Sequence, residues 1–189
     1  MPRNGEHTGV EIKISFDQQV TRALDELGLD GHGEPRRIGF LEDTTVGVAL
    51  PLFHQGIVLR VRQNDDDADD TTVKLRPCRQ SQLAGNWLGA EEGDGWKLTV
   101  EQDWAGSRRA LAASCGSKLP KERIAAVLEG SEPTHRLFSQ GQARFLADCA
   151  GTPINLDALT LLPTDNRNPV EEGSRGERAG RRRRALDHR

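Results

Sequence analysis

Apolar and polar residues alternate along several stretches of the chain, and this period of two predicts β-strands. The first stretch is Val10-Glu11-Ile12-Lys13-Ile14-Ser15-Phe16. Further alternating stretches predict strands at residues 37–42, 57–62, 71–76, 96–104, 108–115 and 155–162. The polar run at residues 64–70 separates two of them and predicts the turn of an antiparallel hairpin.

Three other stretches place apolar residues at helical spacing, namely residues 20–27, 119–129 and 139–149. The last of these begins with Ser139 and Gln142 in the pattern of a capping box, which predicts a well-defined helix start. Strands in runs, with helices outside those runs, predict an α+β domain built on an antiparallel sheet.

The composition of the chain argues against several classes of protein. The chain has 189 residues, of which 29% are charged, and no apolar run approaches the roughly 18 residues of a membrane helix. We therefore expect one soluble domain without membrane association. The N-terminus has no apolar stretch typical of a secretory signal. The three cysteines are widely spaced and form no C-x-x-C pair, so we expect reduced thiols and a cytoplasmic location.

Charge is distributed unevenly between the two parts of the chain. Residues 164–189 contain eight Arg and five acidic residues, whereas residues 1–163 contain 18 basic and 24 acidic residues. The C-terminal stretch has almost no apolar residues, so we expect a domain at residues 9–163 and a disordered Arg-rich tail at residues 164–189. The tail is a candidate for nucleic-acid binding, but aromatic residues for base stacking make up only 4% of the chain, which argues against that function.

Charged residues recur at spacing i, i+2 on four predicted strands, so they share one face of each strand. The sets are Glu11 with Lys13, Arg60 with Arg62, Lys74 with Arg76, and Lys97 with Glu101 and Asp103. An ordinary sheet with a solvated outer face has this pattern. The pattern also fits aliphatic faces that pack outward against the helices, with the charged faces converging inside a barrel or cup. The pattern of residues leaves both arrangements open.

A converging interior would combine two kinds of ligand-binding group. Arg and Lys side chains match the oxygens of phosphate groups. Clustered carboxylates supply the hard oxygen ligands that Mg²⁺ prefers, often alongside substrate phosphates. If the charged faces converge in this way, we expect a site that binds a metal ion together with a polyphosphate.

Five segments together resemble a known family, the CYTH domains, or triphosphate tunnel metalloenzymes. The segments are residues 11–13 (Glu-Ile-Lys), 40–44 (Phe-Leu-Glu-Asp-Thr), 56–62 (Gly-Ile-Val-Leu-Arg-Val-Arg), 72–76 (Thr-Val-Lys-Leu-Arg) and 98–103 (Leu-Thr-Val-Glu-Gln-Asp). Their order and spacing agree with the family over residues 9–163.

The resemblance implies an eight-stranded antiparallel β-barrel, or tunnel, with a charged interior and helices packed outside. It implies a phosphohydrolase that uses Mg²⁺ or Mn²⁺ to hydrolyse an inorganic, thiamine or nucleoside triphosphate. The expected substrate-binding residues are Lys13, Arg60, Arg62, Lys74, Arg76 and Lys97. The expected metal ligands are Glu11, Glu101 and Asp103, and the expected catalytic residues are Glu101 and Lys13.

Two departures from the family pattern leave the enzyme assignment open. The family opens with Glu-x-Glu-x-Lys, and Gly9 stands where the first Glu belongs. The sequence after Leu162 lacks the closing strands of the family, so we expect an incomplete, C-terminally truncated barrel. The alternative to a triphosphatase is therefore a non-catalytic remnant that binds polyphosphate or a nucleotide.

Overall fold

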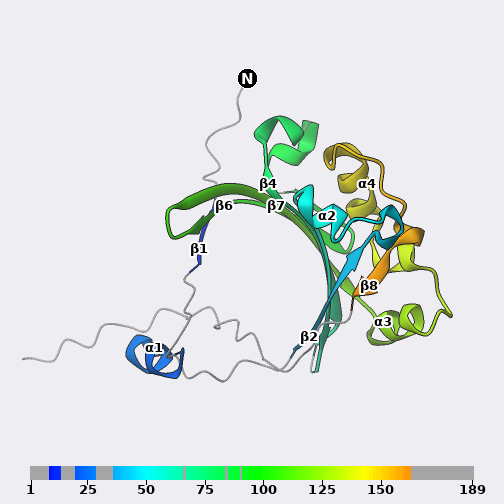
Figure 1. Ribbon diagram of the computed structural model, residues 1–189, viewed down its shortest axis with the longest axis horizontal. Coiled ribbons are helices and arrows are strands. Elements are labelled where there is room, and N and C mark those ends of the chain that lie inside the picture. The colour runs from blue at the N-terminus through cyan, green and yellow to red at the C-terminus, as the bar shows by residue number, and fades with distance from the viewer. Residues whose placement is uncertain are drawn as a thin grey trace, which may run out of the picture. The chain divides into compact units, whose positions relative to one another are not determined.

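A strongly curved eight-stranded sheet is the central feature of the computed structural model, which describes residues 9–13, 20–28, 36–65, 67–83, 85–89 and 91–162 (Figure 1). The strands are β1 (Gly9–Lys13), β2 (Arg36–Glu42), β3 (Ile57–Asn64), β4 (Asp69–Cys78), β5 (Glu91–Gly93), β6 (Trp96–Ala105), β7 (Arg108–Leu119) and β8 (Thr160–Leu162). Their order is β1-β6-β7-β4-β3-β2-β8, and β5 also pairs with β6.

The helices are α1 (Val20–Leu27), α2 (Pro51–His54), α3 (Lys121–Leu128) and α4 (Gln140–Cys149). The 3-10 helices are η1 (Thr44–Val46), η2 (Gln80–Gln82), η3 (Gly85–Leu88), η4 (Thr134–Leu137) and η5 (Leu156–Ala158). Helix α1 belongs to a separate unit of the chain from the sheet, and Arg22 and Glu26 form an ion pair one turn apart along it. None of the described helices is long and apolar enough to cross a membrane.

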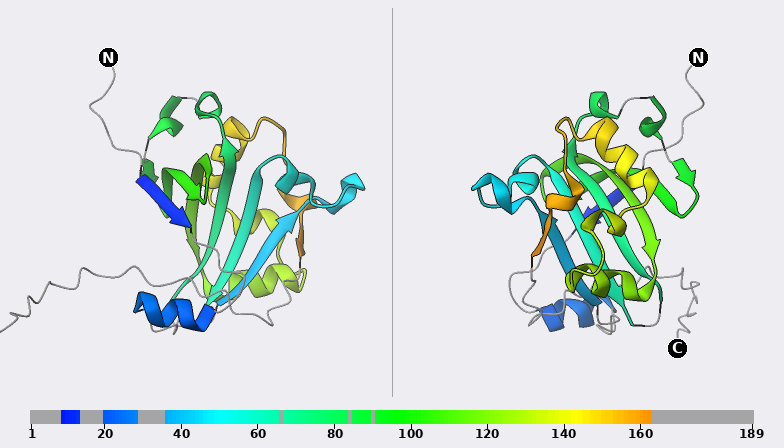
Figure 2. Two further views of the ribbon diagram at one scale, coloured as in Figure 1. Left: turned by 60° about the vertical axis from the view of Figure 1, so that its left-hand side comes forward. Right: turned by 90° about the vertical axis from the view of Figure 1, so that its right-hand side faces the viewer.

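The hydrophobic core lies on the convex side of the sheet, where α3 and α4 cover it (Figure 2). At residues 57–62 of β3 and 69–76 of β4, odd positions such as Leu59 and Val73 are buried, and even positions are partly exposed. Phe145 of α4 and Ile124 of α3 are at most 1% exposed and belong to the same core. Burial of each apolar side chain of this size contributes about 1.5–3 kcal/mol to the stability of the fold. The apolar residues on this face therefore supply most of the favourable free energy of folding.

Two features fix α4 on the sheet. The buried side chain of Gln142 forms hydrogen bonds to β4 and β7, and it also completes the predicted capping box with Ser139. The ring of Trp96 fits against two glycines, since a Cβ atom on Gly93 or Gly141 would come within 2.4 Å of it. These contacts hold the start of β6 against α4.

The expected α+β class, with helices outside the sheet, is confirmed, and β3 and β4 form the expected antiparallel hairpin. Asn64, Asp69 and Asp70, which were expected in its turn, belong to the strands. The sheet is mixed rather than purely antiparallel, because β1 pairs with β6 in parallel. A tight hairpin turn forces two strands to be antiparallel, but β1 and β6 are far apart in sequence, so no such turn sets their direction. The described strands do not close into a barrel.

One local expectation differs from the structure, two short elements were not expected, and two expected segments cannot be compared with the structure. The strand expected at residues 155–162 is only β8, because the Asn155 side chain accepts a hydrogen bond from the Asp157 backbone and supports η5 instead. The pattern of residues did not predict β5 or α2. Residues 14–16, expected to continue β1, and residues 164–189, expected to form a disordered tail, lie outside the described residues.

Candidate functional site

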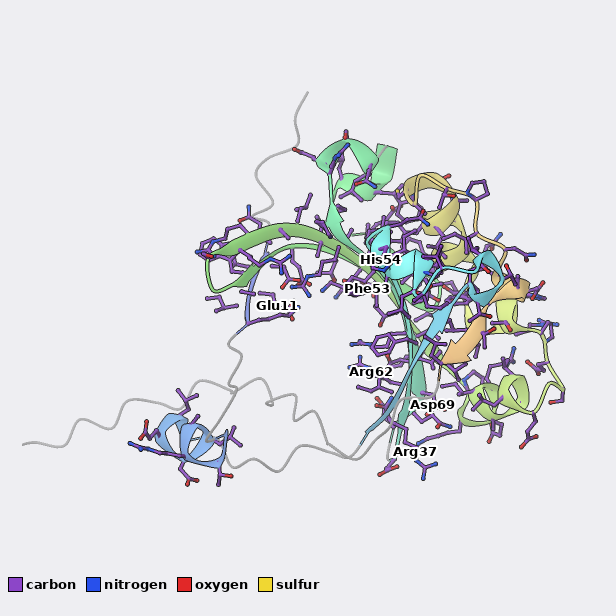
Figure 3. The ribbon with its side chains drawn as sticks, viewed as in Figure 1. Glu11, Arg37, Phe53, His54, Arg62 and Asp69 are labelled. Carbon is purple, nitrogen blue, oxygen red and sulfur yellow. The ribbon has the colours of Figure 1, made fainter. Side chains whose placement is uncertain are left out.

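The charged faces of four strands lie on the concave side of the sheet, opposite the core. Figure 3 shows Glu11 of β1 and Arg62 of β3 on this side, facing the space that the sheet curves around. Strand register places Lys74 of β4 beside Ser114 of β7, which in turn lies beside Thr99 of β6. The aliphatic faces therefore pack outward against the helices and the charged faces share the concave side, but the described strands do not close this side into a barrel.

Six of the expected site residues form one ion-pair cluster across β1, β4 and β6, which we call the carboxylate cluster: Glu11, Lys13, Lys74, Arg76, Glu101 and Asp103. The parallel pairing of β1 with β6 sets Glu11 directly beside Asp103. Lys13 Nζ lies 2.9 Å from Glu11 Oε2 and 3.0 Å from Asp103 Oδ1. Arg76 Nε lies 2.5 Å from Asp103 Oδ2. Three cations thus balance three carboxylates.

Asp103 is the most enclosed member of the carboxylate cluster, with a fully buried side chain. Burial alone would raise the pKa of Asp103, but the hydrogen bond from Lys13 and the charges of Lys74, Lys13 and Arg76 outweigh burial and lower it. Burial would likewise lower the pKa of Lys13, but its hydrogen bonds to Glu11 and Asp103 raise it. Each partner therefore favours the charged form of the other.

The ammonium group of Lys74 takes the position where the three carboxylates converge. Its Nζ lies 3.2 Å from Glu101 Oε1, 3.6 Å from Glu11 Oε2 and 3.7 Å from Asp103 Oδ2. Three hard carboxylate oxygens are a suitable donor set for Mg²⁺. Among the described residues, however, no group of three or more acidic, His or Cys residues is arranged to hold a metal ion. The three carboxylates form ion pairs with Lys13, Lys74 and Arg76 instead.

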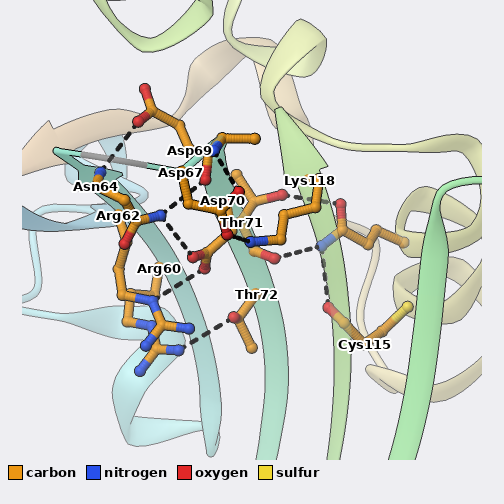
Figure 4. Close-up of polar contacts among 12 residues, drawn as sticks. Arg60, Arg62, Asn64, Asp67, Asp69, Asp70, Thr71, Thr72, Cys115 and Lys118 are labelled. Carbon is orange, nitrogen blue, oxygen red and sulfur yellow. Dashed lines mark hydrogen bonds and ion pairs between the residues drawn. The ribbon is translucent and has the colours of Figure 1, made fainter. Parts of the chain in front are cut away.

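Arg60 and Arg62 have no ion pair with the carboxylate cluster among the described contacts, and Figure 4 shows them beside Asp70 and Thr72. Arg62 Nε forms an ion pair with Asp70 Oδ1 at 3.0 Å, and Arg60 Nη2 donates to the Thr72 hydroxyl at 3.2 Å. Both partners come from the neighbouring strand β4. The two guanidinium groups are thus oriented by the hairpin that carries them.

A pocket of about 410 Å³ lies beside the carboxylate cluster on this face, where β4, β7 and the β5–β6 turn meet. Its polar lining includes Arg62, Asp70, Thr72, Glu92, Lys97 and Lys118. Lys97, the remaining expected binding residue, lies there across from Gly116 of β7 and is not part of the carboxylate cluster.

All nine expected site residues therefore lie on one face, with six in direct contact and Arg60, Arg62 and Lys97 farther along the strands. The sequence analysis missed Asp70 and Thr72. The signal was available, because both precede Lys74 at even spacing on the same strand and so share its face.

Comparison of the chain with protein-family models, with curated proteins and with solved structures finds no match.

Proposed function

We propose that the chain binds a triphosphate on the concave face of its sheet, and that this face corresponds to part of the interior of a CYTH-like tunnel. The observation that carries the proposal is the set of cations that share this face, namely Arg60 and Arg62 on β3, Lys74 and Arg76 on β4 and Lys13 on β1. Phosphate oxygens are the acceptors that suit such a set best.

The cations on β3 and those on β4 would bind phosphate in different ways. Arg60 and Arg62 present guanidinium groups already oriented by Thr72 and Asp70, so they lose little freedom when they bind phosphate. Lys74 and Arg76 are held by carboxylates. A triphosphate that contacts them must compete with Glu101 and Asp103, so binding rearranges the carboxylate cluster.

Metal-dependent hydrolysis of the triphosphate is a second candidate function, favoured by the convergence of three carboxylates on one point. Glu11, Glu101 and Asp103 would hold Mg²⁺ or Mn²⁺ if Lys74 moved onto the phosphates. Such an ion supplies charge stabilisation at phosphate oxygens during in-line attack by water. Lys13 would then neutralise phosphate charge beside Glu101. Without that displacement of Lys74, the site binds without turnover.

A thermal shift experiment tests binding. A ligand that binds only the folded state stabilises it by about 2.7 kcal/mol at a hundredfold excess over its Kd, so tripolyphosphate should raise the Tm. Arg62→Ala should reduce the shift, whereas Arg144→Ala, at an exposed position on α4, should leave it intact. A Tm that tripolyphosphate does not move would contradict the proposed function.

Phosphate release from tripolyphosphate, with and without Mg²⁺ or Mn²⁺, separates the two candidates. Metal-dependent release that Glu101→Gln abolishes would establish the hydrolase. Binding without release would establish the non-catalytic function.

A further inference from the structure

Strand β1 is one edge of the curved sheet. Among the described residues it pairs only with β6, and Figure 1 shows it at the end of the sheet away from α3 and α4. The outer side of β1 therefore presents a row of backbone N–H and C=O groups that no described strand pairs. Such an edge is a template on which a strand of another chain can add.

The two faces of β1 carry different kinds of side chain. Glu11 and Lys13 belong to the carboxylate cluster on the concave side, so Val10 and Ile12 point to the convex side. Val10 is 49% exposed and Ile12 is 69% exposed, although α3 and α4 cover the core elsewhere on that side. Ile12 lies beside Trp104 of β6, which is itself only partly buried. The edge thus combines backbone groups available for pairing with an uncovered apolar surface, which is typical of a protein–protein contact.

The order of charges along β1 makes the strand complementary to a second copy of itself. In an antiparallel pair, side chains that lie directly opposite share one face, so a two-fold symmetric pairing of β1 is centred on a residue. When the centre is Ile12, each Glu11 lies opposite Lys13 of the other copy. When the centre is Glu11 or Lys13, that residue lies opposite its own counterpart, and like charges in this position are destabilising. Charge therefore selects the pairing centred on Ile12.

Glu11 and Lys13 can take on these new partners without losing their present ones. Both side chains are partly exposed, while Lys13 Nζ lies 3.0 Å from Asp103 Oδ1 and Glu11 Oε2 lies 3.6 Å from Lys74 Nζ. Pairing across the two-fold axis adds a carboxylate beside Lys13 and an ammonium group beside Glu11. Each copy thereby contributes one acidic and one basic side chain to the carboxylate cluster of the other.

We propose that two copies of the chain associate through β1, with the strands antiparallel and centred on Ile12, so that their two sheets become one. Ile12 of each copy packs against Ile12 of the other on the convex side, next to Val10 and Trp104. A strand of five residues buries little area, so the dimer is weak and dissociates on dilution. The inference does not depend on the proposed function, because no ligand takes part in the association.

Sedimentation velocity of the full chain without ligand, from low to high micromolar protein, tests the inference. The wild-type chain should change from monomer to dimer as its concentration rises. Ile12→Lys and Ile12→Glu should each stay monomeric, because like charges then lie opposite each other across the two-fold axis. An equimolar mixture of the two variants should dimerise at least tenfold more tightly than either variant alone, since opposite charges then meet. Because Ile12 is exposed and points away from the carboxylate cluster, both variants should fold.

Leu128→Lys is the matched control, since Leu128 is an exposed apolar residue at the end of α3, and this variant should dimerise like the wild type. Hydrogen exchange of the wild-type chain gives a second readout that needs no variant: the backbone amides of residues 9–13 should exchange more slowly at high protein concentration. A wild-type chain that is monomeric at every concentration, a dimer that Ile12→Lys leaves intact, or a mixture that associates no more tightly than its components would overturn the inference. None of these results would affect the proposed function.

Discussion

Gln142 Nε2 donates a hydrogen bond to the Thr71 carbonyl oxygen at 3.1 Å, while Gln142 Oε1 accepts one from the Thr71 hydroxyl at 3.1 Å. The same amide nitrogen donates to the Cys115 carbonyl oxygen at 2.9 Å. Helix α4 is thereby tied to the two strands whose opposite faces carry Thr72 and Gly116. The polar contact in the core thus supports the strands that form the candidate site.

Replacing Gln142 should destabilise the fold strongly. Gln142→Ala leaves several buried backbone and hydroxyl groups without partners, each costing about 1–3 kcal/mol, so we expect the free energy of unfolding to fall by about 3 kcal/mol. Urea denaturation measures this change. Gln140→Ala is the control, because Gln140 is exposed on the same helix and should alter stability by no more than about 0.5 kcal/mol. Similar losses in both variants would show that the Gln142 contacts are not the cause.

Removing the Lys74 ammonium should create affinity for a divalent cation. Lys74→Ala leaves Glu11, Glu101 and Asp103 converging on an unfilled position, and like charges held together favour a metal ion. We expect Mn²⁺ to bind this variant at least tenfold more tightly than the wild-type chain, as measured by electron paramagnetic resonance of free Mn²⁺. Lys97→Ala, outside the carboxylate cluster, should bind Mn²⁺ like the wild type. If Lys74→Ala gains no affinity, the carboxylates do not form a latent metal site.

Acid should remove the stabilising effect of Asp103. The pKa of Asp103 is lowered in the fold, so its contribution is complete above the ordinary Asp pKa of about 3.9 and is lost as pH falls through the lowered value. At about pH 7 the free energy of unfolding should therefore be larger for the wild-type protein than for Asp103→Asn. This difference between the two proteins should become smaller below about pH 4. Urea denaturation across this range checks the trend. Asp94→Asn, at an exposed turn position, should show no such dependence.

High pH should remove the stabilising effect of Lys13 in the carboxylate cluster. The pKa of Lys13 is raised, so its contribution persists below the ordinary Lys pKa of about 10.4 and is lost as pH rises through the raised value. Lys13→Met should accordingly lose stability relative to wild type near neutral pH, and the difference should narrow above about pH 10.4. A difference that stays constant to high pH would mean that Lys13 acts through packing rather than charge.

The cysteines should be inert in the folded protein. Cys78, Cys115 and Cys149 are buried and form no disulfide, and burial raises the pKa of Cys115 to about 12. Since the thiolate is the reactive form, Ellman's reagent should label no thiol in the native chain at about pH 8 and all three after denaturation. Rapid labelling of the native chain would contradict the burial of these residues.

The sequence predicted which charged residues share a face better than it predicted how the strands of the sheet pair. Alternation along single strands was enough to place Arg60 with Arg62 and Lys74 with Arg76, because a strand's two faces follow from its sequence alone. The parallel contact of Glu11 with Asp103 could not be predicted, since the pattern contains nothing that sets the direction of two distant strands. The central position of Lys74 among the carboxylates likewise depends on which strands become neighbours.

The shortest strand and helix could not be predicted from the sequence either. Strand β5 has three residues and helix α2 has four, which is too few to display a period. Strand β5 is held by its pairing with β6. At the start of α2, the side chain of Glu42 accepts hydrogen bonds from the backbone of Leu52 and Phe53. Such long-range capping has no local signature in the sequence.

The alternation that puts Leu59 and Val73 in the core and Arg60 and Lys74 on the opposite face has a consequence for substitutions. If the concave face binds the proposed ligand, substitutions at Arg60 or Lys74 change the groups that bind it, whereas substitutions at Leu59 or Val73 change the packing of the core. Ligand preference and core packing would then be encoded by interleaved residues of the same strands.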